Sequence, residues 1–173
     1  MVLRLALCKS QIARAYKTTA NKVTAWWVAS QIYGHDDVSV QRVKRDPNDP
    51  AKLLMEHRGM RGGAGERLGY LPLLTGNEPM NPAWAGQESV GFPDNWSIGL
   101  SFYHNLFTRE HNLFVDAFRA QAARTPDEDS GLRNPAAPDR VIRYRDVTPE
   151  ELYQVGRLVV AAEFLFRPFT LGD

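Results

Sequence analysis

The sequence has few of the residues that build several common kinds of site. It contains one cysteine, Cys8, in 173 residues, which excludes an internal disulfide and a cysteine-rich zinc or iron–sulfur site within one chain. Its 21 basic and 20 acidic side chains give a formal net charge of +1, so no overall field attracts nucleic acid or an anionic membrane. The sequence has no run of about 18 apolar residues that would span a membrane as a helix. What remains is an ordinary globular composition, 43% hydrophobic and 24% charged.

The strongest helical pattern covers residues 96–123. Asp94 is the expected N-cap, because a short acceptor side chain directly before an apolar periodic run satisfies the first free backbone N–H groups. Ile98, Phe102 and Leu106 recur at the spacing of one helix face. Because further aromatic residues widen this face, the pattern predicts a helix that is buried on most sides.

A second helix is predicted after Thr148. Thr148 is the expected N-cap, Pro149 takes the first helical position, and Glu151 completes a capping box. Pro168 is expected to end this helix, since the residue before a proline avoids the α region. A short helix is also expected over residues 10–17.

The middle of the chain is rich in turn residues. A glycine-rich stretch, residues 58–65, lies between the short apolar runs 52–55 and 70–74. Two interpretations stay open: the stretch joins two strands as a wide hairpin, or it is a mobile loop. Its arginines indicate a solvated loop rather than a nucleic-acid site, because no aromatic residues are interleaved for stacking.

Two histidines lie on the longest predicted helix. His104 and His111 are seven residues apart, about 10 Å along a helix axis, so they cannot share one zinc ion. Arg109, Glu110, His111 and Asn112 form a polar group within this apolar helix. Burying such groups without partners costs several kcal/mol, so they either face solvent or form a satisfied buried network. The sequence leaves both options open.

Residues 24–30 alternate in a pattern that resembles an ion-binding loop. Thr24 and Ser30 carry hydroxyl oxygens, and position 26, a tryptophan, can offer its backbone carbonyl. Hard cations such as Ca²⁺ need six to eight oxygens, usually including a carboxylate. The central position is Val28, which offers no side-chain oxygen.

Three segments resemble the animal-type haem peroxidase superfamily, in the order that the superfamily has them. They read TAWWVASQIYG (24–34), HNLFTREHN (104–112) and ELYQVGRLV (151–159). The Trp26–Trp27 pair and the segment GFPDNW (91–96) are most similar to the α-dioxygenase branch and its bacterial relatives.

The resemblance implies a mainly α fold, part of a haem peroxidase-like helical domain with a long irregular loop and hairpin region. Residues 23–163 are expected to form this part, with an unmatched segment 1–22 before it and a divergent tail 164–173 after it. The implied function is a haem-dependent peroxidase or fatty-acid dioxygenase, linked to oxidative stress or oxylipin formation. Hydrogen peroxide and a small organic or fatty-acid substrate are the implied partners.

The resemblance also implies cofactors and site residues. Haem b is expected to be non-covalent, because residues 95–100 carry no carboxylate for an ester link. The family's calcium loop corresponds to Thr24, Trp26, Val28 and Ser30, and valine at position 28 predicts a degraded site. The candidates on the haem-pocket helix are His104, Arg109, Glu110, His111 and Asn112.

The chain departs from the family at the haem histidines. The 23 residues before Thr24 contain no histidine, although the family places its distal histidine there. The family's proximal histidine follows the Arg-Glu-His-Asn helix, but none of the four histidines here follows His111. We therefore expect an internal fragment of a longer domain, inactive by itself. The alternative is a non-catalytic fragment that acts as a helical interaction module. Localisation and oligomeric state are not indicated by the sequence.

Overall fold

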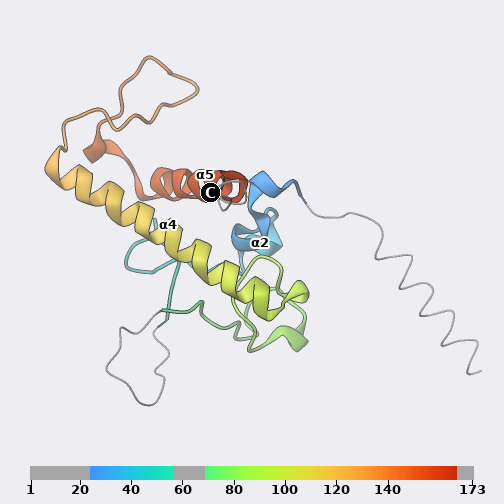
Figure 1. Cartoon of the computed structure of the whole chain (residues 1–173). Helices are drawn as coiled ribbons and strands as arrows, with labels where there is room; N and C mark the ends of the chain where they lie inside the picture. The colour runs from blue at the N-terminus through green and yellow to red at the C-terminus, as the bar shows by residue number, and fades with distance from the viewer. Residues whose placement is uncertain (1–23, 57–68, 167–173) are drawn as a thin grey trace, which may run out of the picture.

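The computed structural model describes residues 24–56 and 69–166 (Figure 1). The part of the chain that it describes is mainly helical, and its extended segments pair through isolated antiparallel bridges rather than through a sheet. The elements are η1 (Trp26–Val28), α2 (Ser30–Tyr33), α3 (Asp37–Val40), η2 (Pro82–Trp84), η3 (Pro93–Asn95), α4 (Ile98–Arg124), η4 (Tyr144–Asp146) and α5 (Pro149–Phe166). The predicted mainly α class is confirmed.

The long helix α4 begins later than the sequence pattern predicts. Its N-cap is Ser97, whose Oγ accepts a hydrogen bond from the backbone N–H of Leu100 at 3.2 Å. The prediction of Asp94 as N-cap is wrong, because Asp94 lies inside the 3₁₀ turn η3, which opens on Pro93. Trp96 is then extended (ψ 137°), and this breaks the helical path between the two elements.

The buried face of α4 is not the apolar face of Ile98, Phe102 and Leu106 that the sequence pattern predicts. Ile98 and Phe102 are 82% and 64% exposed, so the prediction of a helix buried on most sides is wrong. The buried side chains of α4 are His104, Asn105, Phe107, Thr108, His111 and Val115. Polar residues therefore occupy most of the face that packs on the rest of the molecule, and much of the apolar surface of the first turns points outward.

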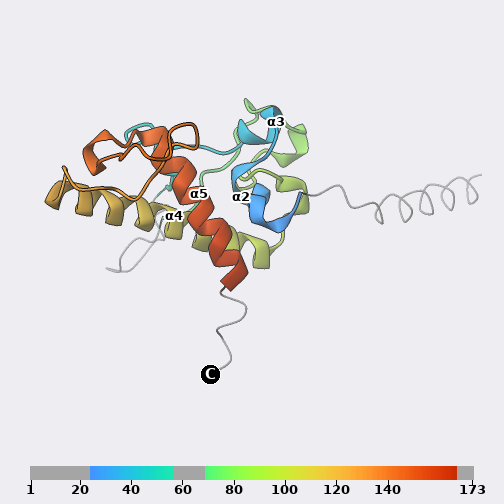
Figure 2. The same cartoon turned by 90° about the horizontal axis from the view of Figure 1, so that it is seen from above.

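The helix α5 begins as predicted and packs across α4 in both views (Figures 1 and 2). The Oγ1 of Thr148 accepts from the backbone N–H of Glu151 at 3.2 Å, and the Glu151 carboxylate accepts from the Thr148 N–H at 2.8 Å. This reciprocal pair confirms the capping box. The main apolar core lies where α5, α2 and α4 meet, and comprises Ala29, Ile32, Tyr33, Leu53, Phe107, Tyr153, Val160 and Ala161.

Two irregular segments, residues 44–56 and 69–91, lie along α4. They are joined to each other by an antiparallel bridge between Glu56 and Tyr70, with backbone hydrogen bonds of 2.7 and 2.8 Å. The glycine-rich stretch predicted as a hairpin or a loop lies outside the described residues, as do the predicted helix 10–17 and His57. None of the described helices is long and apolar enough to cross a membrane.

Candidate functional site

His111 lies at the centre of the buried polar face of α4. Its side chain is fully buried, and both ring nitrogens are used by the protein. Nε2 lies 2.9 Å from the carbonyl oxygen of Ala51, and Nδ1 lies 2.9 Å from the hydroxyl of Tyr33. Burial is the largest cause that lowers the pKa of His111, so the ring is neutral at pH 7. This geometry makes His111 a hydrogen-bonded core residue.

Arg109 and Asn112, which belong to the same polar group as His111, hold loop backbone against α4. Asn112 forms two hydrogen bonds of 2.9 Å with Leu53, accepting from its N–H and donating to its carbonyl. Arg109 donates to the carbonyl of Gly69 at 2.7 Å, and Glu110 is half-buried beside it on the helix. Of the two options that the sequence leaves open, the structure shows the satisfied network for Arg109, His111 and Asn112.

His104 lies two turns before His111 on the same face. Its side chain is 2% exposed, yet neither ring nitrogen has a hydrogen-bond partner among the described residues. The hydroxyl of Thr108, one turn later and fully buried, has no partner among them either. Burial lowers the pKa of His104, so its ring is held neutral. Unpaired buried polar atoms are costly, and they make His104 the least satisfied residue of the motif.

Two further side chains that the sequence analysis missed complete this face. Asn105 accepts from the N–H of Leu71 at 3.0 Å and donates to a Glu88 carboxylate oxygen at 2.9 Å. Tyr33, the last residue of α2, supplies the hydroxyl for His111. Asn105 and Asn112 are seven residues apart, so they lie on the same face of the helix. This spacing is the sequence signal that could have indicated a row of amides that bind loop backbone.

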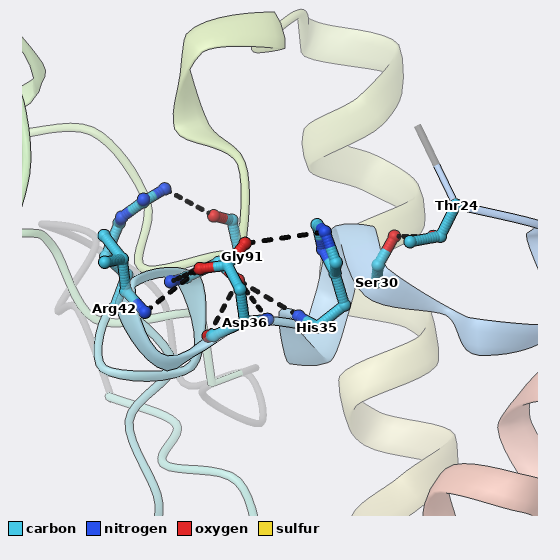
Figure 3. A network of polar contacts seen from close by, with 8 residues as sticks. Thr24, Ser30, His35, Asp36, Arg42 and Gly91 are labelled. Atoms are coloured by element: carbon cyan, nitrogen blue, oxygen red, sulfur yellow. Dashed lines mark hydrogen bonds and ion pairs between the residues drawn. The ribbon is translucent and has the colours of Figure 1, made fainter. Parts of the chain in front are cut away.

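The loop that resembles a calcium site is closed by its own side chains (Figure 3). The hydroxyl oxygens of Thr24 and Ser30 are 2.6 Å apart and hydrogen-bonded to each other. Val28 is half-buried and supplies no oxygen, and the described residues contain no group of three or more His, Cys, Asp or Glu side chains arranged for a metal. This donor set does not fit Ca²⁺, which needs six to eight oxygens.

The segment after this loop is locked to the chain near Gly91. A Cβ on Gly91 would lie 2.4 Å from the carbonyl oxygen of Ser30, so only glycine allows this backbone approach. Arg42 is 8% exposed and donates to the carbonyl of Gly91 at 2.6 Å (Figure 3). His35 lies beside it, with Nε2 3.5 Å from a carboxylate oxygen of Asp36. These contacts fix the entry of the chain into α4.

The described histidines do not assemble an iron-binding pocket. His111 uses both nitrogens, the ring of His104 is enclosed in packed protein, and the ring of His35 stacks on Phe92 with centroids 5.2 Å apart. A cavity of about 330 Å³ lies elsewhere, and no histidine lines it. Its lining residues are Asn134, Arg140, Val141, Ile142, Asp146 and Glu151. A haem iron therefore does not fit the donor atoms that these residues present.

The family model described as "Animal haem peroxidase" matches residues 2–165 of the chain. The chain belongs to the animal haem peroxidase family. Neither a curated protein nor a solved structure matches it significantly. Family membership indicates a peroxidase-type oxidoreductase at the level of the family, and haem is the cofactor that the family implies. This match confirms the resemblance that the sequence indicates. In this structure Arg109, His111 and Asn112 hold loop backbone against α4.

Proposed function

We propose that this chain provides helical framework for haem-dependent oxidation of the peroxidase type, driven by peroxide and acting on a small organic or fatty-acid substrate. The family match over residues 2–165 supports the reaction class. The contacts of α4 support the framework role, because Arg109, His111 and Asn112 each hold the backbone of a loop that lies along the helix. Peroxidase and fatty-acid dioxygenase activity both remain within this proposal.

The same contacts lead us to propose negligible turnover by the 173-residue chain itself. Peroxide chemistry needs an iron ligand and an acid–base group within hydrogen-bond reach of the peroxide. Neither His104 nor His111 presents a ring nitrogen to a cavity. Any haem that the chain takes up is proposed to be non-covalent haem b.

A haem titration followed by activity assays tests this proposal. Purified, monodisperse protein is titrated with haem while the Soret band is recorded, and bound haem is then extracted with acid acetone. A saturable Soret change without the spectrum of a histidine-ligated iron, together with complete extraction, supports the framework role and non-covalent binding. Guaiacol oxidation and fatty-acid oxygen uptake are expected to stay at the level of free haem. Robust turnover that is lost in His104→Ala or His111→Ala would show that one of these histidines serves the iron or the proton.

The alternative function is a helical interaction module, and one observation favours it. Ile98, Phe102, Tyr103 and Leu113 on α4 are each more than half exposed, at 82%, 64%, 53% and 60%. Exposed apolar patches of this kind mark interaction surfaces or aggregation-prone faces. Absence of any saturable haem binding, together with a self-association that Phe102→Ser abolishes in light scattering, would favour this alternative.

A further inference from the structure

The loop that joins α4 to α5, residues 125–148, is held by its own hydrogen bonds (Figure 1). The carbonyl oxygen of Ile142 accepts from both the N–H and the hydroxyl of Ser130, at 2.9 and 2.6 Å. The N–H of Tyr144 donates to the carbonyl of Glu128 at 3.1 Å. Because these bonds join the two sides of the loop, its shape does not depend on a bound ligand.

The cavity of about 330 Å³ lies between this loop and the first turn of α5. Small-molecule sites in proteins span about 300–1,000 Å³, so this cavity suits a small ligand. Its lining combines one guanidinium, two carboxylates, one carboxamide and two aliphatic side chains, those of Arg140, Asp146, Glu151, Asn134, Val141 and Ile142. Val141 is 51% exposed, so a ligand with an apolar part would remove apolar surface from water here.

Arg140 differs from the other arginines of this loop. The others form ion pairs with aspartates of the same loop: Arg133 with Asp129 at 2.6 Å, and Arg143 and Arg145 with Asp127 at 3.6 and 2.5 Å. The Arg140 guanidinium forms neither a hydrogen bond nor an ion pair with the residues that the structure describes. A guanidinium carries five N–H donors and no acceptor, so Arg140 offers the cavity a planar fork that matches a carboxylate.

Glu151 and Asp146 supply the opposite charge on the other side of the lining. Both contacts of Glu151 with Thr148 use Oε2, at 2.8 Å each, which leaves Oε1 without a partner among residues 24–56 and 69–166. The hydrogen bond from the Thr148 N–H lowers the pKa of Glu151, so its carboxyl is ionised at neutral pH. Asp146 lies 3.8 Å from Nε of Arg145, at the long end of the ion-pair range. Both carboxylates can therefore accept from an ammonium group, which has three donors.

The mixture of charges selects the ligand. An anion alone would pair with Arg140 but would be repelled by two carboxylates, and an amine alone would be repelled by the guanidinium. We propose that this cavity binds a small zwitterion, an α-amino acid with an aliphatic side chain. Its carboxylate pairs with Arg140, and its ammonium pairs with Asp146 and Glu151. Its side chain lies on Val141 and Ile142. The site is independent of the proposed function, since binding involves no haem.

A titration of the unaltered chain with three probes tests the site. The ¹⁵N-labelled 173-residue protein is titrated with L-leucine at pH 7 while its amide spectrum is recorded. We expect saturable shifts confined to the loop and the first turn of α5. The probe 4-methylpentanoate lacks the ammonium, and 3-methylbutylamine lacks the carboxylate. Each should bind about tenfold more weakly or worse, because each loses charge-assisted hydrogen bonds. No saturable shift with L-leucine up to its solubility limit would overturn the proposal, as would equal affinity for either truncated probe.

Three variants assign the charges. Arg140→Gln should weaken L-leucine binding about tenfold or more, whereas Arg124→Gln, the matched control outside the cavity, should leave it unchanged. Glu151→Gln should weaken the binding of L-leucine and of 3-methylbutylamine, while glutamine still serves in the capping box. Unshifted amides elsewhere in the spectrum report that each variant is folded. Unaltered affinity in folded Arg140→Gln would overturn the proposal. If a variant does not fold, the comparison of the three probes on the unaltered chain decides.

Discussion

The imidazole ring of His111 lies directly on the backbone of Gly156, so that α4 and α5 touch at a glycine. A Cβ at position 156 would lie 2.6 Å from Cε1 and 2.7 Å from Nδ1 of the ring. The ring cannot move aside cheaply, because Tyr33 and Ala51 hold its two nitrogens. Gly156 thus sets how closely α5 approaches the polar face of α4.

Gly156→Ala is therefore expected to destabilise the fold. Overpacking of this kind costs about 1–3 kcal/mol, which outweighs the gain of up to about 1 kcal/mol in helix propensity. The measurement is the free energy of unfolding in urea. Gly99→Ala is the matched control in α4, because its Cβ would meet only Ser97 Oγ, at 4.0 Å. Equal stability of the two variants would contradict the contact.

Asn112→Ala should also lower stability, by about 1–3 kcal/mol, because it leaves both backbone groups of Leu53 without their partner. The exposed amide of Gln154 bonds at the surface of α5, so Gln154→Ala is the control and should change stability little. Hydrogen exchange gives a local readout: the Leu53 amide is expected to lose protection in Asn112→Ala. Retained protection would mean that other contacts fix residues 51–54.

Stability should fall as the pH drops below about 6.5, the ordinary pKa of histidine. Burial lowers the pKa of both His104 and His111, so the unfolded chain takes up protons that the folded chain does not. Each histidine then reduces the free energy of unfolding by up to about 1.4 kcal/mol per pH unit, until its folded-state pKa is reached. Above pH 6.5 this contribution is fully present. Urea unfolding at pH 7.5, 6.5 and 5.5 measures the slope.

His104→Leu is expected to leave stability unchanged or to raise it at pH 7.5. The substitution removes two buried nitrogens that have no partner among the described residues and keeps an apolar side chain of similar size. It should also remove roughly half of the slope below pH 6.5. A loss of more than about 2 kcal/mol at pH 7.5 would show that the imidazole makes a valuable contact.

The loop of Thr24, Val28 and Ser30 is expected to bind no calcium tightly. Val28→Asp restores a charged oxygen ligand and should raise calcium affinity roughly tenfold or more, since affinity follows ligand charge. Val28→Asn is the control, with similar size and no charge. Isothermal calorimetry measures both. Micromolar affinity in the unaltered chain, or no gain in Val28→Asp, would contradict this expectation.

The sequence by itself determined the features that depend on neighbours in the chain. Thr148 and Glu151 are three residues apart and cap each other wherever α5 packs, so their pattern could be interpreted without a fold. The end of α4 is local as well, because Pro126 directly follows the C-cap Thr125. The same holds for the family motif, whose residue order alone pointed to the animal haem peroxidases.

Only the tertiary structure decided what the polar residues of α4 do. His111 bonds to Tyr33 and Ala51, which lie 78 and 60 residues away, and no local pattern encodes such partners. The same distance effect reversed the expectation for Ile98 and Phe102. They follow helical spacing, but the side chains that hold the loops, the amides of Asn105 and Asn112 and the imidazole of His111, lie further along α4 and leave these two apolar residues uncovered. Spacing shows which residues share a face, whereas the partners available across the fold decide which face is buried.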